Sequence, residues 1–105
     1  MPVPLMLCVL LACGLSVSGA SAADPARIAA GRACMACHAA DRALVGPAFK
    51  QIAARYQGDP GAPARLARKI RNGGSGAWGR VPMPPSARVT PAEAEQLARW
   101  VLQHR

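Results

Sequence analysis

Residues 34–38 read Cys34-Met35-Ala36-Cys37-His38, and their spacing decides how the rest of the chain is interpreted. Two cysteines three positions apart share one face of a helical turn, so both sulfurs can bond the two vinyl groups of one porphyrin. The histidine follows four positions after the first cysteine, and its imidazole can reach an iron at the centre of the same ring. The spacing therefore predicts one covalently attached haem c, with the histidine as an iron ligand.

A Cys-x-x-Cys pair has two other common interpretations. A zinc site needs two further ligands, but residues 24–105 contain no other cysteine and only one other histidine, His104. A dithiol redox site of the thioredoxin kind follows a strand in a βαβ unit, and we find no segment with the period of a strand. Haem attachment is the better supported interpretation.

Residues 1–23 carry no charged side chain and end in a run of small residues from Gly19 to Ala23. An apolar stretch followed by small residues is typical of a secretory signal peptide, although the usual basic residues at its start are missing here. We predict cleavage after Ala22 or Ala23, which would release residues 24–105 into the periplasm.

Two alternatives to cleavage remain open at this stage. Residues 10–13 resemble the site at which bacterial lipoproteins are lipidated on a cysteine, here Cys13. A segment of about 20 apolar residues is also long enough to span a membrane if it is retained. The glycines Gly14 and Gly19 and the serines of the segment favour removal as a signal.

The predicted mature domain, residues 24–105, is basic and poor in aromatic residues. The chain has 13 Lys and Arg against 5 Asp and Glu, a net charge of +8, and all of these charged residues follow residue 23. One domain of this size buries little apolar surface and usually needs a staple or a cofactor. Its aromatic residues are only Phe49, Tyr56, Trp78 and Trp100. We therefore expect a bound group to fill part of the core.

Four segments are predicted to be helical. The first starts at Asp24-Pro25, a capping residue followed by proline, and is expected to run toward Cys37. The last starts at a capping box formed by Thr90 and Glu93. The two others are expected near residues 49–57 and 63–72. The inner face of the last helix is expected to hold Ala94, Leu97, Ala98 and Val101. Residues 73–88 are rich in glycine and proline and are predicted to form an irregular, functional loop.

An electron carrier usually closes both faces of its iron with protein ligands, and the candidates for the second face can be counted. Met1 and Met6 are lost with the signal, and Met35 lies between the anchoring cysteines, on the wrong face. Met83 and His104 remain. Met83 lies among prolines, which stiffen a loop and suit a weak thioether ligand, although it could also simply fill the core. His104 is next to the last residue, where chains fray. The residues favour Met83.

With these features in place, the sequence resembles the small bacterial class I cytochromes c, in particular the c-551 type that donates electrons to periplasmic nitrite reductase. The resemblance covers nearly all of residues 24–105. The matching stretches are residues 34–38, 45–50, 70–73, 77–79, 81–85 and 97–102.

The resemblance implies an all-α fold of about four helices wrapped around one covalently bound haem. It implies that His38 and Met83 are the axial iron ligands. It further implies that the Pro47 carbonyl accepts the ring N–H of His38, and that the Trp78 indole donates to a haem propionate. Lys69 stands where the family has an arginine that pairs with a propionate. Lysine supplies the positive charge but cannot form the two parallel hydrogen bonds that an arginine makes with a carboxylate.

The resulting functional prediction is a periplasmic single-electron carrier of a respiratory or denitrification chain, and not an enzyme. Iron with two protein ligands has no open position for a substrate. A haem enzyme or a gas sensor, which needs an open sixth position, is the alternative. We expect a monomer whose partners are redox proteins with acidic docking surfaces, such as a nitrite reductase or a terminal oxidase. Nucleic acid is not expected as a partner, because the protein is exported and its cations are scattered.

Overall fold

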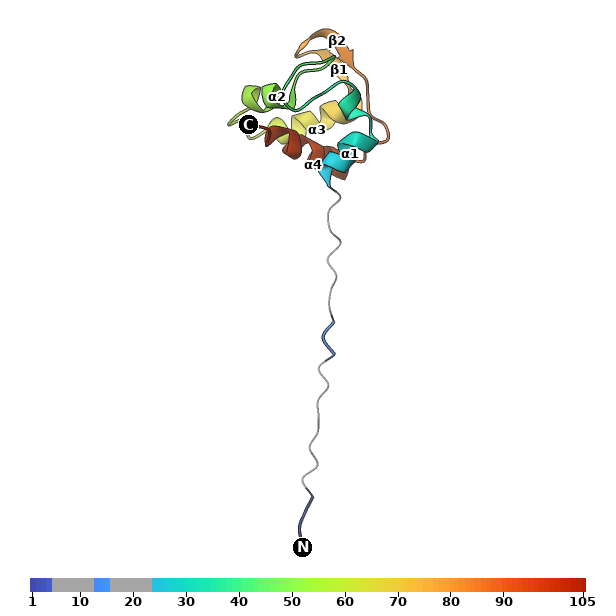
Figure 1. The fold of residues 1–105 in the computed structure, drawn as a ribbon, viewed down its shortest axis with the longest axis vertical. Coiled ribbons are helices and arrows are strands. Elements are labelled where there is room, and N and C mark those ends of the chain that lie inside the picture. The colour runs from blue at the N-terminus through green and yellow to red at the C-terminus, as the bar shows by residue number, and fades with distance from the viewer. Residues whose placement is uncertain (5–12, 16–23) are drawn as a thin grey trace.

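The computed structural model describes residues 1–4, 13–15 and 24–105 (Figure 1). The predicted cleavage site after Ala22 or Ala23 lies outside these residues. No helix in the described part of the chain is long and apolar enough to cross a membrane. The elements are α1 (Pro25–Gly31), a 3-10 turn (Cys34–Ala36), α2 (Phe49–Arg55), α3 (Ala62–Asn72), β1 (Gly74–Gly76), β2 (Gly79–Met83) and α4 (Pro91–Leu102).

Helix α1 begins where it was predicted but ends earlier. The Asp24 carboxylate accepts the backbone N–H of Ala26 at 3.0 Å, as an N-terminal cap should. The expectation that this helix runs toward Cys37 is wrong, because it ends at Gly31. Ala33 has a left-handed backbone with φ of 61°, which a right-handed helix cannot continue through. Cys34 therefore starts a separate 3-10 turn, and Cys37 is the capping residue at its end.

Helices α3 and α4 pack side by side and form the base of the domain (Figure 1). The predicted inner face of α4 is confirmed, since all four of its residues are buried. Two of the four are alanines, which allow the helices to approach closely. The larger cluster of buried residues contains Ile28, Ala29, Ala67, Val89, Ala94, Leu97 and Ala98. Few of these side chains are large, so the helices alone build a thin core.

The predicted start of α4 is also confirmed. The Thr90 side chain accepts the backbone N–H of Glu93 at 3.2 Å, and the Glu93 carboxylate accepts the backbone N–H of Thr90 at 3.0 Å. This hydrogen bond to the Thr90 backbone lowers the pKa of Glu93. The reciprocal pair satisfies two N–H groups that a helix start would otherwise leave free.

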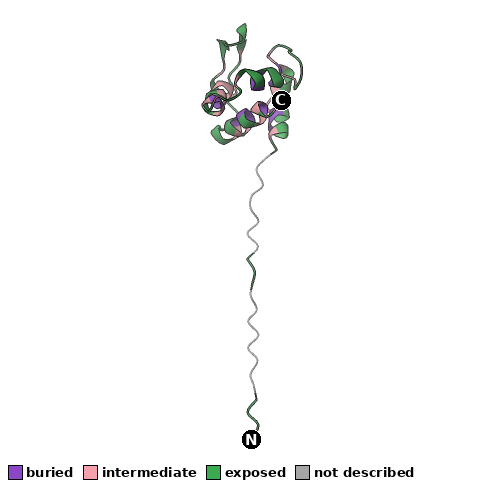
Figure 2. Cartoon of the chain, turned by 90° about the vertical axis from the view of Figure 1, so that its left-hand side faces the viewer, coloured by how far each residue is buried: buried purple, intermediate pink, exposed green. Residues whose placement is uncertain are grey.

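The expectation that the chain has no strand is wrong in residues 73–88. Strands β1 and β2 pair antiparallel, with Gly74 opposite Met83 and Gly76 opposite Gly79. Neither strand buries a face, and Figure 2 shows the hairpin projecting from the helices as an exposed ribbon. A strand without a buried face has no alternating apolar pattern, so its sequence carried no strand signal.

Candidate functional site

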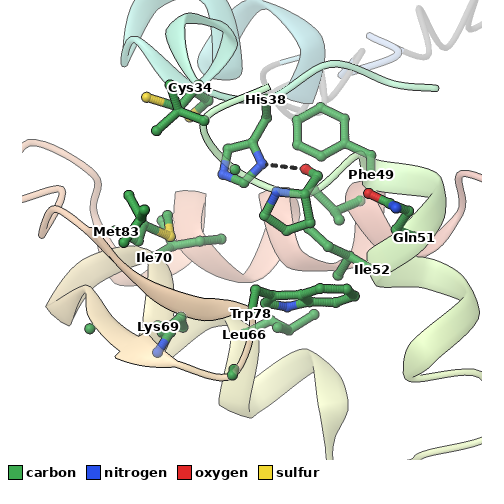
Figure 3. Close-up of a pocket in the computed structure, with 18 of the residues that line it drawn as sticks. Cys34, His38, Phe49, Gln51, Ile52, Leu66, Lys69, Ile70, Trp78 and Met83 are labelled. Carbon is green, nitrogen blue, oxygen red and sulfur yellow. Dashed lines mark hydrogen bonds between the residues drawn. The ribbon is translucent and has the colours of Figure 1, made fainter. Parts of the chain in front are cut away.

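A cavity of about 430 Å³ lies between the cysteine-containing turn and the β1–β2 hairpin. This volume is within the range of about 300–1,000 Å³ that is typical of ligand and cofactor sites. Figure 3 shows Cys34 and His38 on one side of it, and Met83 and Trp78 on the other. The cavity is lined by every site residue proposed from the sequence: Cys34, Cys37, His38, Pro47, Lys69, Trp78 and Met83.

The 3-10 turn and the two residues after it present the two cysteines and the histidine together. The backbone N–H of Cys37 donates to the Cys34 carbonyl at 3.3 Å, and that of His38 donates to the same carbonyl at 3.0 Å. The two sulfurs are free thiols rather than a disulfide, and burial raises the pKa of the Cys34 thiol. A pair of free thiols on one turn, next to an imidazole, is the arrangement needed for covalent attachment of a porphyrin.

The imidazole of His38 is held in one orientation by its neighbours. Its Nδ1–H donates to the Pro47 carbonyl at 2.7 Å (Figure 3). A carbonyl can only accept, so Nδ1 carries the proton and Nε2 keeps its lone pair. The Phe49 ring stacks against the imidazole with centroids 5.4 Å apart. Such a hydrogen bond orients a metal-binding histidine and fixes its tautomer.

Gly46 is a part of this arrangement that the sequence showed only as a turn. A Cβ atom at this position would lie 2.5 Å from Cε1 of His38, too close for any real contact. The ring can therefore occupy its observed place only because residue 46 has no side chain.

Replacing Gly46 with alanine is expected to displace the His38 ring and to break its bond to the Pro47 carbonyl. Overpacking of this kind costs about 1–3 kcal/mol, so the holoprotein should melt earlier and its haem absorption spectrum should change. Gly31→Ala is the matched control, because nothing lies within 4 Å of a Cβ at Gly31. A Gly46→Ala protein with wild-type melting and spectrum would contradict the assigned packing.

Met83 is the last residue of β2 and approaches the cavity from the side opposite to His38 (Figure 3). Its place depends on Gly73, the capping residue at the end of α3. Gly73 has φ of 67°, and a Cβ there would lie 2.4 Å from the Met83 carbonyl oxygen. The sequence indicated this glycine only as a helix stop. The close approach of the two backbones brings the methionine to the cavity.

His104, the other candidate ligand, does not line the cavity. Its Nδ1 lies 2.9 Å from the Trp100 carbonyl, at the end of α4. Its ring packs against Phe49 and Trp100, with centroids 5.1 Å and 4.7 Å apart. These contacts hold His104 against Phe49 and Trp100, outside the cavity lining. They support Met83 as the residue that faces His38.

Lys69 and Trp78 place nitrogen donors at the hairpin side of the cavity. Lys69 comes from α3, and its amino group would lie 2.9 Å from a Cβ at Gly74 of β1. Trp78 lies in the turn between the strands, with 42% of its surface exposed. A second cation, which the sequence did not indicate, lies here: the Arg55 guanidinium carbon is 4.5 Å from the centroid of the Trp78 ring.

These residues fit a haem c. The paired thiols and the lone pair of His38 Nε2 lie on one side, a thioether sulfur lies on the other, and apolar side chains lie between them. The nitrogen donors of Lys69 and Trp78 at the edge suit the acidic groups of a haem.

Comparison with known proteins agrees with this geometry. The family model described as Cytochrome c matches residues 22–105. Cytochrome c-551 of Pseudomonas aeruginosa is 48% identical over 103 residues, which cover 97% of this chain and 98% of that protein. Cytochrome c-552 of Nitrosomonas europaea is 46% identical over 91 residues, which cover 87% of each chain. The crystal structure of wild-type Nitrosomonas europaea cytochrome c552 has a TM-score of 0.74 and 45% identity, covering 76% of this chain and 99% of that one.

Proposed function

Because this chain belongs to the cytochrome c family, as a small class I member that carries one covalent haem c and acts as an electron carrier, we propose that it works in the periplasm with His38 and Met83 as axial iron ligands. In this proposal Cys34 and Cys37 form the thioether bonds to the haem. Residues 1–23 direct export.

The observation that carries this proposal is the placement of His38 and Met83 on opposite sides of one cavity. The haem iron supplies a reversible one-electron couple when it is bound. His38 offers Nε2 as a ligand, because Nδ1 is engaged by Pro47. The thioether of Met83 favours the ferrous state and so raises the potential.

Two protein ligands on the iron would also exclude reactions that need a substrate to bind the iron. With both axial positions filled, no substrate can reach the iron, so the protein is a carrier and not a haem enzyme or a gas sensor. The test is exposure of the native ferrous holoprotein to carbon monoxide at neutral pH. The absorption spectrum should stay unchanged, whereas formation of a carbon monoxide complex would require an open iron and overturn the proposal.

The partners we propose are redox proteins with acidic docking surfaces, such as a nitrite reductase or a terminal oxidase. The support is the excess of positive charge, +8, all of it within residues 24–105. Opposite charges on two proteins speed their encounter and orient them before they dock.

The rate of electron transfer to such a partner is expected to fall roughly tenfold as ionic strength rises from low to physiological values. The Debye length falls from about 30 Å at 0.01 M to about 8 Å at 0.15 M, which screens exposed charges. Stopped-flow measurement of the second-order rate constant across this range tests the expectation. A rate that is flat, or that increases with salt, would exclude electrostatic guidance.

A further inference from the structure

Arg55 makes two contacts with the turn between β1 and β2, although it lies on another element. It is the last residue of α2 and is exposed. Its Nη1 donates to the Ala77 carbonyl, and its guanidinium carbon lies 4.5 Å from the centroid of the Trp78 ring. One side chain therefore contacts both the backbone and the aromatic ring of the turn.

The turn has little else to hold it in place. The two strands are three and five residues long, and a two-stranded hairpin alone is marginally stable in water. Gly76 and Gly79, which flank the turn, have φ of 105° and 110°, in a region that restricts other residues far more than glycine. Within residues 24–105, the Arg55 bond is the only hydrogen bond that reaches residues 75–79 from outside the hairpin.

We propose that Arg55 is a positioning residue: it holds the β1–β2 turn against α2 and thereby orients Trp78 at the edge of the cavity. An arginine suits both contacts at once, because its planar group can stack on an indole while its edge donates a hydrogen bond. A lysine keeps the charge but lacks the flat, forked group.

The proposal has a redox consequence that rests on the proposed function. If the indole of Trp78 donates its N–H to an acidic group of the haem, the orientation of the indole affects the potential. Loss of the Arg55 contacts should then change the potential through Trp78, and not only through the loss of one positive charge.

The first experiment measures amide hydrogen exchange of residues 75–79 in the holoprotein. Losing one hydrogen bond and one cation–π contact should raise the exchange of these amides roughly five- to thirty-fold in Arg55→Ala, and less in Arg55→Lys. Arg68→Ala is the control, since it removes the same charge from an exposed residue of α3. Wild-type exchange in Arg55→Ala would overturn the proposal whatever ligands the iron has.

The second experiment measures the midpoint potential in a double-mutant cycle of Arg55→Ala and Trp78→Ala. Arg55→Ala should shift the potential when Trp78 is present, by more than Arg68→Ala does, and shift it little when Trp78 is absent. Equal shifts in both backgrounds would show a pure charge effect and overturn the positioning role.

Arg55→Lys gives a second readout that does not depend on folding of the Trp78→Ala variant. It should shift the potential in the same direction as Arg55→Ala, and a wild-type potential in Arg55→Lys would also count against the positioning role. Carbon monoxide binding by the wild-type protein would instead refute His38 and Met83 as axial ligands. The hydrogen-exchange result would still test the Arg55 contacts, because it does not depend on the iron ligands.

Discussion

Replacement of both Cys34 and Cys37 with alanine is expected to leave residues 24–105 largely unfolded, and not merely free of haem. The cavity that we propose the haem fills measures about 430 Å³, and apolar side chains such as Leu66, Ile70 and Val81 line it. Without the haem, these side chains would face water instead of the cofactor. A typical domain is stable by only about 5–15 kcal/mol, so it has little margin for such a loss. The thin helical core offers little to offset that loss.

Far-ultraviolet circular dichroism and thermal melting of the purified double variant test this expectation. Met35→Ala is the matched control, because Met35 lies between the two cysteines and 43% of its surface is exposed. That variant should keep its haem, its helical spectrum and its melting temperature. Native-like helical dichroism in a haem-free double variant would show that the chain builds its core without the cofactor.

The features that could be predicted from the sequence are those set by local spacing. The spacing of Cys34, Cys37 and His38 indicated the site because it fits the chemistry of one bound group. The capping box of Thr90 and Glu93 indicated the start of α4 because its hydrogen bonds join residues only three apart. At these places the residues that act together are close in the sequence, so they could be recognised without knowing how the rest of the chain folds.

Other features were missed because the sequence carries no local signal for them. The end of α1 at Gly31 follows from the left-handed backbone of Ala33, an alanine that no propensity rule marks as a stop. The hairpin pairs two strands that have no buried face, so they lack the alternation by which strands are recognised.

The two glycines of the site show the same limit. Gly46 and Gly73 read as a turn and a helix stop, which is what their neighbours in the sequence indicate. Their further role arises from the approach of the His38 ring and of the Met83 backbone, respectively. A side chain that must be absent leaves no pattern in a single sequence, and only the folded arrangement shows why it is absent.

Met83→Ala is expected to open the iron while leaving the haem attached. Loss of the thioether should abolish the near-red charge-transfer band that methionine ligation gives to ferric haem in proteins of this kind. It should also lower the potential by a sizeable part of the ~0.8 V range that axial ligands span, and allow the ferrous protein to bind carbon monoxide. The covalent attachment should survive, because Cys34 and His38 lie on the other side of the cavity (Figure 3) and Cys37 belongs to the same turn as Cys34. Absorption spectra and a redox titration measure these effects.

His104→Ala is the control, and it separates the two candidate ligands. The contacts of His104 lie with Trp100 and Phe49 at the end of α4, so its loss should leave the near-red band and the potential close to wild type. If His104 were the ligand, the pattern would reverse: His104→Ala would open the iron and Met83→Ala would be nearly silent. A band that persists in Met83→Ala would overturn the axial assignment. It would also remove the structural argument against a catalyst, because that argument is the closure of both faces of the iron.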